Sequence, residues 1–501
     1  MKKVLVCLCM FAISLASYGK SVDESTAQKV AYNFLKPKTN LQGLSDLSLV
    51  YTSNSVLNGN NIIYFYIYNS TSTQGFVIVS GDDIVMPVLG YSTESAFKAN
   101  KINTSLQYVL DNYKNQILYA IQNNENATSQ VTSKWTDLYT ASSSTRAART
   151  TTLPVAPMLP TLWDQMNEFS SVLTYNADCP YDAAAATPAQ TITGCVATAM
   201  SQVMKYWNWP DTGVGNNTYT QSPNPDGIPE QTADFTIAYH FDSMQVPYTN
   251  RANKYVAKLM YFAGVSVNMN YGTPDEDGSG AYVTAASAYG GASAETALQN
   301  NWRYPSSVGY SRRHFTQTQW IDSMINEMSS ARPVIYGGQG SQGGHCWVMD
   351  GFDNDSFFHF NWGWSGNSDG YFTVNNLTPN GDTFNNSQEA IIRIVADTPA
   401  NYSSDTSTKV KVTGVTTVAA PENNINIFPN PATNSINVSF QGIPAKELMI
   451  TDIEGRTVQQ MTVASTASSL TLSVNDLPNG MYLLRLQTDQ GMLTRKFVVA
   501  K

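Results

Sequence analysis

One cysteine, Cys195, lies where a reactive thiol is expected. It follows Gly194 in the stretch TITGCVATAM, and apolar side chains then recur at steps of three and four residues. This spacing predicts a helix with one buried face. In the first turn of a helix, the unpaired N–H groups and the helix dipole favour a thiolate and lower the pKa of a cysteine. Most single cysteines beside apolar residues are nevertheless small buried hydrophobes, so the nucleophile hypothesis requires a partner for Cys195.

The best candidate partner is His345, which ends the glycine-rich stretch YGGQGSQGGH. Gly343 and Gly344 predict a loop that can lie close to an extended substrate backbone, so we expect both to bind substrate. The spacing between Cys195 and His345, 345 minus 195 or 150 residues, is at the long end for papain-type enzymes. Two other histidines, His240 and His314, have no motif around them. His359 lies in a predicted strand, where it is expected to be structural or to lie next to the same site.

The strand that follows could supply the group that orients the histidine. SFFHFNWGWSG comes after the turn-like FDNDS, which predicts a hairpin with its turn near residues 353–354. His345 would then lie across from residues 361–363, and the amide of Asn361 would accept a hydrogen bond from the imidazole. Trp362 and Trp364 fit a packed aromatic cluster that also shields this pair.

Acyl transfer also needs hydrogen-bond donors for the developing oxyanion. The backbone N–H of Cys195 is one candidate, and the side-chain amide of Gln165 in TLWDQMNEF is another. On its own, Gln165 fits a surface position better. Three aspartates (Asp164, Asp350 and Asp353) could be combined into carboxylate pairs, but aspartates beside Gly and Asn usually form turns.

The cysteine count bears on disulfides and metals. Without an N-terminal signal, only Cys179, Cys195 and Cys346 remain, an odd number for an exported protein, so at least one thiol is expected to be free or paired between molecules. No CxxC or other ligand spacing is present, so we expect no metal and no cofactor. Because side chains alternate along a strand, Cys346 is expected to face away from the site that His345 faces. Cys179 is expected in a loop.

Composition limits the classes of partner. The chain has 501 residues, of which 42% are hydrophobic and 13% charged, with a formal net charge of −9. A negative balance argues against nucleic acid and against an anionic membrane surface as partners. MKKVLVCLCMFAISLASYGK has the layout of a cleavable secretory signal, and no other stretch is long and apolar enough to cross a membrane. An exported, soluble product is expected.

The chain reads as several domains separated by Ser/Thr-rich linkers. The first domain shows helical and strand patterns and no obvious chemistry, the second contains the candidate site, and the last has short alternating strands broken by turns, which predicts a β-sandwich. The stretch TASSSTRAARTTTLPVAPMLP carries Arg146 and Arg149 and fits a linker or an activation cleavage site. The predicted boundaries are 1–19 (signal peptide), 20–150, 151–395, 396–420 (linker) and 421–501.

Three motifs in this order resemble the streptopain family of secreted papain-like cysteine proteases. They are LWDQ…CP…GCVATAMSQVMKYW…P, then GGHCWVMDG, then FHFNWGWSG…DGYF, and together they cover most of residues 155–395. GFVIVSGDDIVMPVLGYS is similar to the inhibitory propeptide of that family. The implied fold class is α+β: a papain-like catalytic domain preceded by a small α+β propeptide and followed by a C-terminal β-sandwich. Cys346 is a departure, since a small apolar residue often follows the histidine in the family.

The resemblance assigns roles residue by residue. It implies that Cys195 is the nucleophile, His345 the general base and acid, and Gln165 the oxyanion donor, while Asn361 and Trp362 orient and shield the histidine. The propeptide would block the site as an intramolecular inhibitor until the linker near Arg146 and Arg149 is cut. Protein substrates would lie along Gly343 and Gly344, with an apolar side chain in a pocket lined by the stretch DEDGSGA, which includes Ser279.

The last eighty residues resemble the C-terminal sorting domain of the type IX secretion system in Bacteroidetes. FPNPATNSINVSF, DIEGRTV, LPNGMYLLRLQTDQG and the final KFVVAK carry this resemblance. It implies export across the outer membrane by the secretion machinery, to the medium or the cell surface. The primary hypothesis is thus a secreted cysteine endopeptidase zymogen. The alternatives are a non-catalytic binding protein on this fold and an acyl or transglutaminyl transferase with the same triad.

Overall fold

The computed structural model describes most of the chain after the N-terminal segment and divides it into two compact units, Met1–Ser404 and Asp405–Lys501. The described residues are 19–140, 155–166, 175–246, 253–275, 278–340, 343–375, 377, 385, 387–397, 426–430, 432–440, 445–452, 457–463, 468–488, 491–499 and 501.

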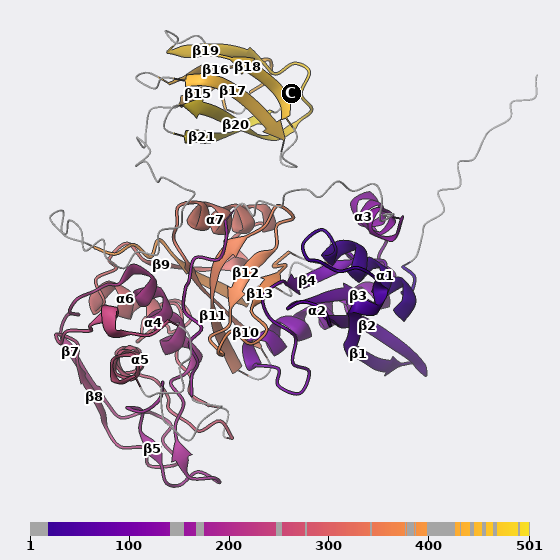
Figure 1. The fold of residues 1–501 in the computed structure, drawn as a ribbon. Coiled ribbons are helices and arrows are strands. Elements are labelled where there is room, and N and C mark those ends of the chain that lie inside the picture. The colour runs from indigo at the N-terminus through magenta and orange to yellow at the C-terminus, as the bar shows by residue number, and fades with distance from the viewer. Residues whose placement is uncertain are drawn as a thin grey trace, which may run out of the picture. The chain divides into compact units, whose positions relative to one another are not determined.

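A ten-stranded antiparallel sheet runs through the first unit and joins strands from its two ends. Its order is β1-β2-β3-β4-β13-β12-β11-β10-β14-β9 (Figure 1). The bounds are β1 Leu47–Leu57, β2 Asn60–Ser70, β3 Phe76–Ser80, β4 Val88–Ser92, β9 Val308–Ser311, β10 Val334–Gly340, β11 Gly343–Phe352, β12 Phe358–Asn361, β13 Gly370–Phe372 and β14 Gln388–Ile392. Strands β1–β4 of the N-terminal part therefore extend the sheet of the central part.

The junction between the two parts is the pairing of β4 with β13. Tyr91 lies opposite Tyr371, and Gly90 lies opposite Phe372. A Cβ atom on Gly90 would lie 2.8 Å from the ring of Phe372, so this close approach of the strands requires glycine. The two tyrosine rings stack with their centroids 5.1 Å apart. The N-terminal part is thus hydrogen-bonded to the edge of the sheet that contains the candidate site.

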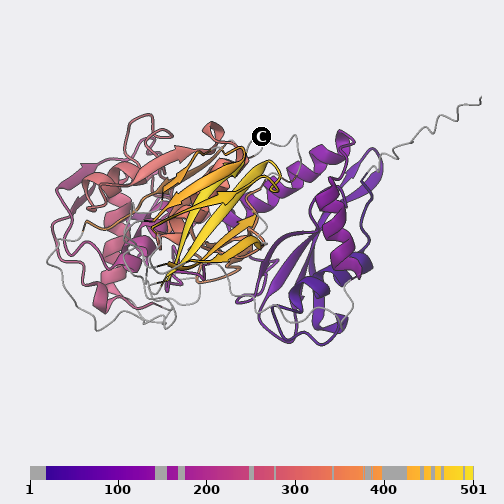
Figure 2. The same ribbon diagram turned by 90° about the horizontal axis from the view of Figure 1, so that it is seen from above.

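Helices cover the two faces of this sheet differently. On one face, α1 (Glu24–Leu35) packs on β2 and β3, and α3 (Ser129–Thr140) packs on α1. Farther along the same face, α4 (Cys195–Trp207) packs on β10 and β11, and α5 (Lys254–Ser266) and α6 (Ala294–Asn300) pack on α4. The other face is covered by α2 (Thr104–Gln122) and α7 (Gln317–Ser329). Viewed from above, the indigo N-terminal elements and the magenta helices lie at opposite ends of the unit (Figure 2).

Helix α2 is the element that spans both halves of the sheet. It contacts β2 in the N-terminal part and β11 in the central part. Its N-terminus is capped by Asn103, whose side chain accepts the N–H of Leu106 at 2.8 Å, which satisfies one of the free donors of the first turn. Leu106, Val109 and Tyr113 recur on its buried face. The helical and strand predictions for the first domain are confirmed over these elements.

Short elements complete the first unit. Two small sheets pair β5 (Tyr181–Asp182) with β6 (Ala189–Gln190) and β7 (Asn216–Tyr219) with β8 (Gln231–Asp234). The 3-10 helices are η1 Leu44–Asp46, η2 Phe241–Ser243 and η3 Arg312–His314. In the described parts of the chain, no helix is long and apolar enough to span a bilayer.

The second unit is a β-sandwich, as the alternating strands predict. One sheet has the order β15-β16-β19 and the other β18-β17-β20-β21. Ile436, Leu448, Leu484 and Phe497 are among the fully buried residues between them, in the alternation expected of sheets with one inner face. The strands are β15 Asn426–Phe428, β16 Ser435–Ser439, β17 Ala445–Asp452, β18 Thr457–Thr462, β19 Ser469–Ser473, β20 Gly480–Thr488 and β21 Gly491–Val499.

Candidate active site

Cys195 is the first residue of α4, as the sequence predicts. The preceding Gly194 has φ +84°, and a Cβ atom there would lie 2.7 Å from Cε of Met269 and 3.0 Å from the carbonyl oxygen of Ser279. Both the backbone angle and the crowding therefore require glycine. The hydroxyl of Thr198 donates to the carbonyl of Gly194 at 3.0 Å, which fixes the turn from inside the helix.

The thiol of Cys195 is less activated than its position at the helix start predicts. Burial raises its pKa above the ordinary value, although hydrogen bonds from the backbone N–H groups of Cys346, Val196 and Cys195 itself act in the opposite direction. Desolvation disfavours the charged form, and here it outweighs the donors at the helix terminus. In this structure burial therefore disfavours the thiolate of Cys195.

Gln165 is held beside the loop that leads to Cys195. Its backbone carbonyl accepts the N–H of Thr193 at 3.1 Å, and the residue is only 3% exposed, unlike a typical surface glutamine. The neighbouring Asp164 does form a turn, because its carboxylate accepts the N–H of Gln165 at 2.7 Å and the hydroxyl of Ser365 at 2.6 Å. Gln165 is thereby tied both to the start of α4 and to the loop after β12.

Ser279 has a structural role in this arrangement. Its hydroxyl donates to the carbonyl of Ile192 at 2.7 Å and accepts the N–H of Gly272 at 3.0 Å, so it ties Gly272 to the segment that leads to Cys195. Residues 276–277 of the predicted pocket stretch lie outside the described residues. Gly343 and Gly344 open β11 opposite Gly340 and Gln339.

The structure places His345 away from Cys195. His345 points to the face of the sheet that α2 covers, where its ring lies 5.4 Å from that of Tyr108. Burial lowers the pKa of His345, and the carboxylate of Asp111 on α2 opposes this shift. Cys195 packs in the core on the opposite face. The candidate nucleophile and base are thus separated by β11 itself.

Cys346, and not His345, faces α4. It is 1% exposed and packs with Val348 in the same core cluster as Cys195, and the charge of Cys195 contributes to raising its pKa after burial, the main cause. The alternation of side chains along β11 is as predicted. The prediction that Cys346 faces away from the site is wrong, because in this structure His345 takes the outward position. Cys179 lies in a loop, as predicted, but is buried.

The predicted hairpin is present, with a different register. The turn spans residues 353–357, and its Asp353 carboxylate accepts the N–H groups of Asp355 and Phe357. Phe352 pairs with Phe358, so the chain turns later than predicted. A bulge between Met349 and Gly351 makes up only one residue of this difference, and Asn361 lies opposite Val348 rather than His345. The predicted register, which brings His345 across from residues 361–363, is therefore wrong.

Asn361 forms its side-chain hydrogen bonds with other residues. Its carbonyl oxygen accepts from the side chain of Gln202 at 3.0 Å and from the N–H of Gly363 at 3.1 Å, and its amide donates to the carbonyl of Thr161 at 2.7 Å. Gln202 lies seven residues after Cys195 on α4, two turns along the helix, and is completely buried. Asn361 therefore bridges α4, the segment of Gln165 and the loop after β12.

Trp362 belongs to the predicted aromatic cluster. It is 1% exposed, its indole N–H donates to the carbonyl of Ser368 at 2.8 Å, and its ring lies 5.3 Å from Trp347 and 5.0 Å from Phe372. Its backbone N–H donates to Asp369, whose pKa burial raises to about 8. Trp364 packs at the edge of the same cluster.

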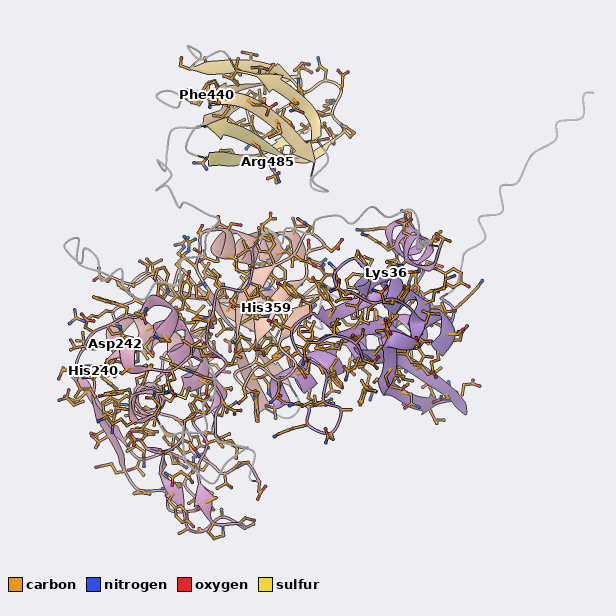
Figure 3. All side chains as sticks on the ribbon, viewed as in Figure 1. Lys36, His240, Asp242, His359, Phe440 and Arg485 are labelled. Atoms are coloured by element: carbon orange, nitrogen blue, oxygen red, sulfur yellow. The ribbon has the colours of Figure 1, made fainter. Side chains whose placement is uncertain are left out.

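His359 holds a buried charge that the sequence did not reveal. Its Nδ1 lies 2.5 Å from a carboxylate oxygen of Asp350, and its Nε2 lies 2.5 Å from one of Glu94 in the N-terminal part. Burial alone would lower the pKa of His359, but the two carboxylates raise it to about 10, so the imidazole is a cation at neutral pH. Figure 3 labels His359 on the central strands of the unit. Asp350 thus pairs with a histidine and does not form a turn.

A second polar contact joins the N-terminal part to the hairpin turn. Asp353 accepts the hydroxyl of Tyr91 at 2.7 Å and lies 3.6 Å from Nζ of Lys38. Burial raises the pKa of Asp353, and these two neighbours oppose the shift. The hydroxyl of Ser92 also donates to the carbonyl of Asp369 at 2.7 Å. The N-terminal part is therefore held to the hairpin by charge as well as by strand pairing.

Residues outside the motifs carry much of this arrangement. Tyr108 and Glu94 lie outside the motifs, whereas Gln202 lies within the motif GCVATAMSQVMKYW, where its polar type on a buried helix face was a signal in the sequence. His240 and His314 are exposed, as expected of incidental histidines. Arg146 and Arg149 lie outside the described residues. No cluster of His, Cys, Asp and Glu with metal-binding geometry occurs in the described part.

Family models match three segments of the chain. Residues 19–117 match the Spi protease inhibitor, residues 163–372 the Peptidase C10 family, and residues 426–500 the secretion system C-terminal sorting domain. The sorting domain indicates type IX secretion, so the protein is secreted or displayed at the cell surface. The order of the three matches agrees with the predicted order of propeptide, protease and sorting domain.

Known proteins resemble the first two of these segments together. Streptopain of Streptococcus pyogenes is 31% identical over 368 residues, which cover 68% of this chain and 81% of streptopain. Thiol protease/hemagglutinin PrtT of Porphyromonas gingivalis is 27% identical over 76% of this chain and 42% of its own length. The solved structure of a prointerpain A fragment from Prevotella intermedia is 26% identical, with a TM-score of 0.53, over 70% of this chain and all of that fragment.

Residues 19–117, which include α1 and most of α2, match an inhibitor domain, and residues 163–372 of the central part match a protease domain. A likeness to streptopain at this identity and coverage establishes the family. The chain therefore belongs to the peptidase C10 family and is a cysteine peptidase made with an inhibitory propeptide.

Proposed function

We propose that the chain is a latent endopeptidase that hydrolyses protein substrates through Cys195 and His345 once its propeptide has left. The observation that carries this proposal is the position of His345. The propeptide residue Tyr108 holds its imidazole on one face of the sheet, while Cys195 lies on the other. A propeptide that separates the two reacting groups explains how a complete set of catalytic side chains can be inactive.

In the active enzyme, His345 exchanges places with Cys346 and faces Cys195. The imidazole takes the thiol proton, and the thiolate attacks the carbonyl carbon of the scissile peptide bond. The imidazolium then protonates the leaving amine, which leaves an acyl group on Cys195. His345 next takes a proton from water, and the resulting hydroxide hydrolyses the thioester and restores the thiol.

Neighbouring groups stabilise and orient this pair. The N–H of Cys195 and the amide of Gln165 donate to the oxyanion. After the exchange, Asn361 accepts a hydrogen bond from His345, and Trp362 shields that bond from water. Gly343 and Gly344 bind the substrate backbone, and Ser279 shapes the adjacent pocket through its hydrogen bonds to Ile192 and Gly272.

The cleavage that starts this change is proposed to fall within residues 141–154. Helix α3 ends at Thr140 and is anchored to the propeptide, since Asn33 donates to the carbonyl of Leu138 at 2.6 Å. Val155 already pairs with Phe352 on β11. A cut after Arg146 or Arg149 would therefore separate two anchored segments without disrupting either.

The test compares the chain from residue 20 to its end with its Cys195→Ala variant on casein, with and without a thiol-alkylating epoxide inhibitor. Loss of the nucleophile should lower casein hydrolysis by at least about a thousandfold. Cys179→Ala is the matched control, because Cys179 is a buried thiol in a loop, and its variant should hydrolyse casein at close to the parent rate if it folds.

Two results would contradict the proposal. If the parent chain never cleaves casein after its propeptide is removed, the chain is a binding protein on a protease fold. If released peptides are joined to amines instead of water, the enzyme is a transferase. Sequencing the new N-terminus of the processed chain tests the cleavage segment.

A further inference from the structure

Two of the three cysteines in the described part of the chain lie beside each other in the latent form. Cys346 points from β11 into the core cluster in which Cys195 also packs. The backbone N–H of Cys346 makes a hydrogen bond with the sulfur of Cys195, and the charges of the two thiols interact. This hydrogen bond joins the two residues directly, and both are free cysteines in this structure.

The third cysteine has a different environment. Cys179 lies in the loop before β5, and its thiol interacts with three tyrosines of the core, Tyr219, Tyr261 and Tyr271. Burial raises its pKa, and the nearby charge of Asp178 adds to this shift. The groups that interact with Cys179 are thus tyrosines and an aspartate, so Cys179 serves as an internal control.

We propose that Cys195 and Cys346 form an intramolecular disulfide in the latent chain, and that this disulfide keeps the enzyme inactive until it is reduced. The position of the disulfide follows from the geometry of the two residues, whereas its consequence for activity rests on the proposed role of Cys195. Exported proteins meet oxidising conditions, in which a pair of adjacent thiols is readily converted to a disulfide.

Formation of this disulfide is a two-electron oxidation, with hydrogen peroxide as the oxidant. The Cys195 thiolate attacks one oxygen of the peroxide and releases hydroxide, which gives a sulfenic acid on Cys195. The Cys346 thiolate then attacks that sulfur, the S–S bond forms, and hydroxide leaves. The two protons of the thiols and the two hydroxides make two water molecules, so two thiols are oxidised while one peroxide is reduced.

Exposure suits the two residues to these unequal roles. Cys195 is partly exposed and can meet the oxidant first, whereas Cys346 is 1% exposed and can only resolve the sulfenic acid. The disulfide would also block activation. Because His345 and Cys346 are consecutive in one strand, they face opposite sides, and a bond from Cys346 to Cys195 prevents His345 from taking that position.

The experiment uses the full chain from residue 20 and three variants: Cys346→Ala, Cys179→Ala and Cys195→Ala. Each is treated with hydrogen peroxide, the remaining thiols are alkylated, and the unreduced protein is digested for mass spectrometry. We expect a linked peptide pair containing Cys195 and Cys346 in the parent and in Cys179→Ala. This pair should be absent from Cys346→Ala and Cys195→Ala.

Casein hydrolysis after dithiothreitol gives a second readout. The casein hydrolysis rates of the parent and of Cys179→Ala should return to within about twofold of those of untreated protein. The rate of Cys346→Ala should return to a level at least about tenfold lower, because an unresolved sulfenic acid proceeds to a sulfinic acid that dithiothreitol does not reduce. Absence of the linked peptides in the parent, or full recovery of Cys346→Ala, would overturn the disulfide. Linked peptides in a chain that never cleaves casein after reduction would support the disulfide and contradict the proposed protease function.

Discussion

At the scale of single residues, the buried imidazolium of His359 connects the propeptide to the protease. Asp350 lies in the segment that matches the protease family, whereas Glu94 lies in the segment that matches the inhibitor. Asp350 also accepts the N–H of Leu159 at 2.8 Å, in the segment that leads to Gln165. His359 thus links Glu94 to a carboxylate that also holds the segment of Leu159.

Replacing this carboxylate should weaken the hold of the propeptide. In Glu94→Gln, His359 loses one of its two counter-charges. Since the Glu94 side chain is 46% exposed, solvent screens the pair, and we expect a loss of about 1 kcal/mol, or about 2–4 °C in the melting temperature of the latent chain. Thermal melting in the Cys195→Ala background measures it, with the exposed Glu230→Gln as the control.

The pH dependence follows from the same pair. Burial acts to raise the pKa of Glu94, but the hydrogen bond and charge of His359 outweigh it and hold that pKa below its ordinary value of 4.5. A lowered folded pKa gives stability that is present above pH 4.5 and lost as the pH falls through the lowered value. The pKa of His359 is raised, so the stability that His359 contributes is complete below pH 6.5 and is lost as the pH rises towards about 10.

The difference in melting temperature between the parent and Glu94→Gln should therefore be constant near neutral pH and shrink in acid. A difference that stays the same in acid, or one that Glu230→Gln reproduces, would show that Glu94 does not act through its charge on His359.

At the scale of elements, the start of α4 depends on the glycine before it. Gly194→Ala should cost about 1–3 kcal/mol of stability because of the positive φ, and crowding by Met269 should move Cys195 and reduce casein hydrolysis further. Gly290→Ala is the matched control, since Gly290 has φ +83° and a Cβ atom there would have no neighbour within 4 Å. Thermal melting and casein assays of both variants separate backbone strain from crowding. Equal effects would exclude a special role for the space around Gly194.

Helix α2 provides the second test at this scale. Tyr108 is 8% exposed, packs on His345 and Trp347, and hydrogen-bonds Ser387 at 3.2 Å. Tyr108→Ala should cost about 3 kcal/mol in the latent chain, as for other buried aromatic residues, and should speed the appearance of processed enzyme. The control is Asn115→Ala, an exposed position of the same helix. Unchanged processing in Tyr108→Ala would contradict the proposed hold on His345.

At the scale of the whole molecule, the two units have separate cores. The sandwich of the second unit is built around its own buried residues, such as Leu448 and Phe497, and the first unit is built around three other clusters. A chain ending at Ser404 should therefore keep its melting temperature within about 2 °C and its casein activity after processing. Loss of folding on truncation would show that the units depend on each other.

Much of this molecule could be predicted from local patterns. The repeat after Cys195 predicts α4, the alternating runs predict β2, β3 and the sandwich, and FDNDS predicts the hairpin. These succeed because helix and strand periodicities depend on near neighbours in sequence. Long-range partners have no such signal. The pairing of Glu94 with His359, 265 residues apart, and the stacking of Tyr108 on His345 arise only when β4 joins β13 and α2 crosses the sheet.

The sequence by itself determined which side chains this enzyme carries and that consecutive residues of β11 face opposite sides. Only the tertiary structure decided which of them faces Cys195. Side chains alternate along a strand with a period of two. When His345 faces away from Cys195, Cys346 therefore faces it, with no change in sequence or in secondary structure. In this structure Cys346 lies on the face that α4 covers, and His345 lies on the face that α2 covers.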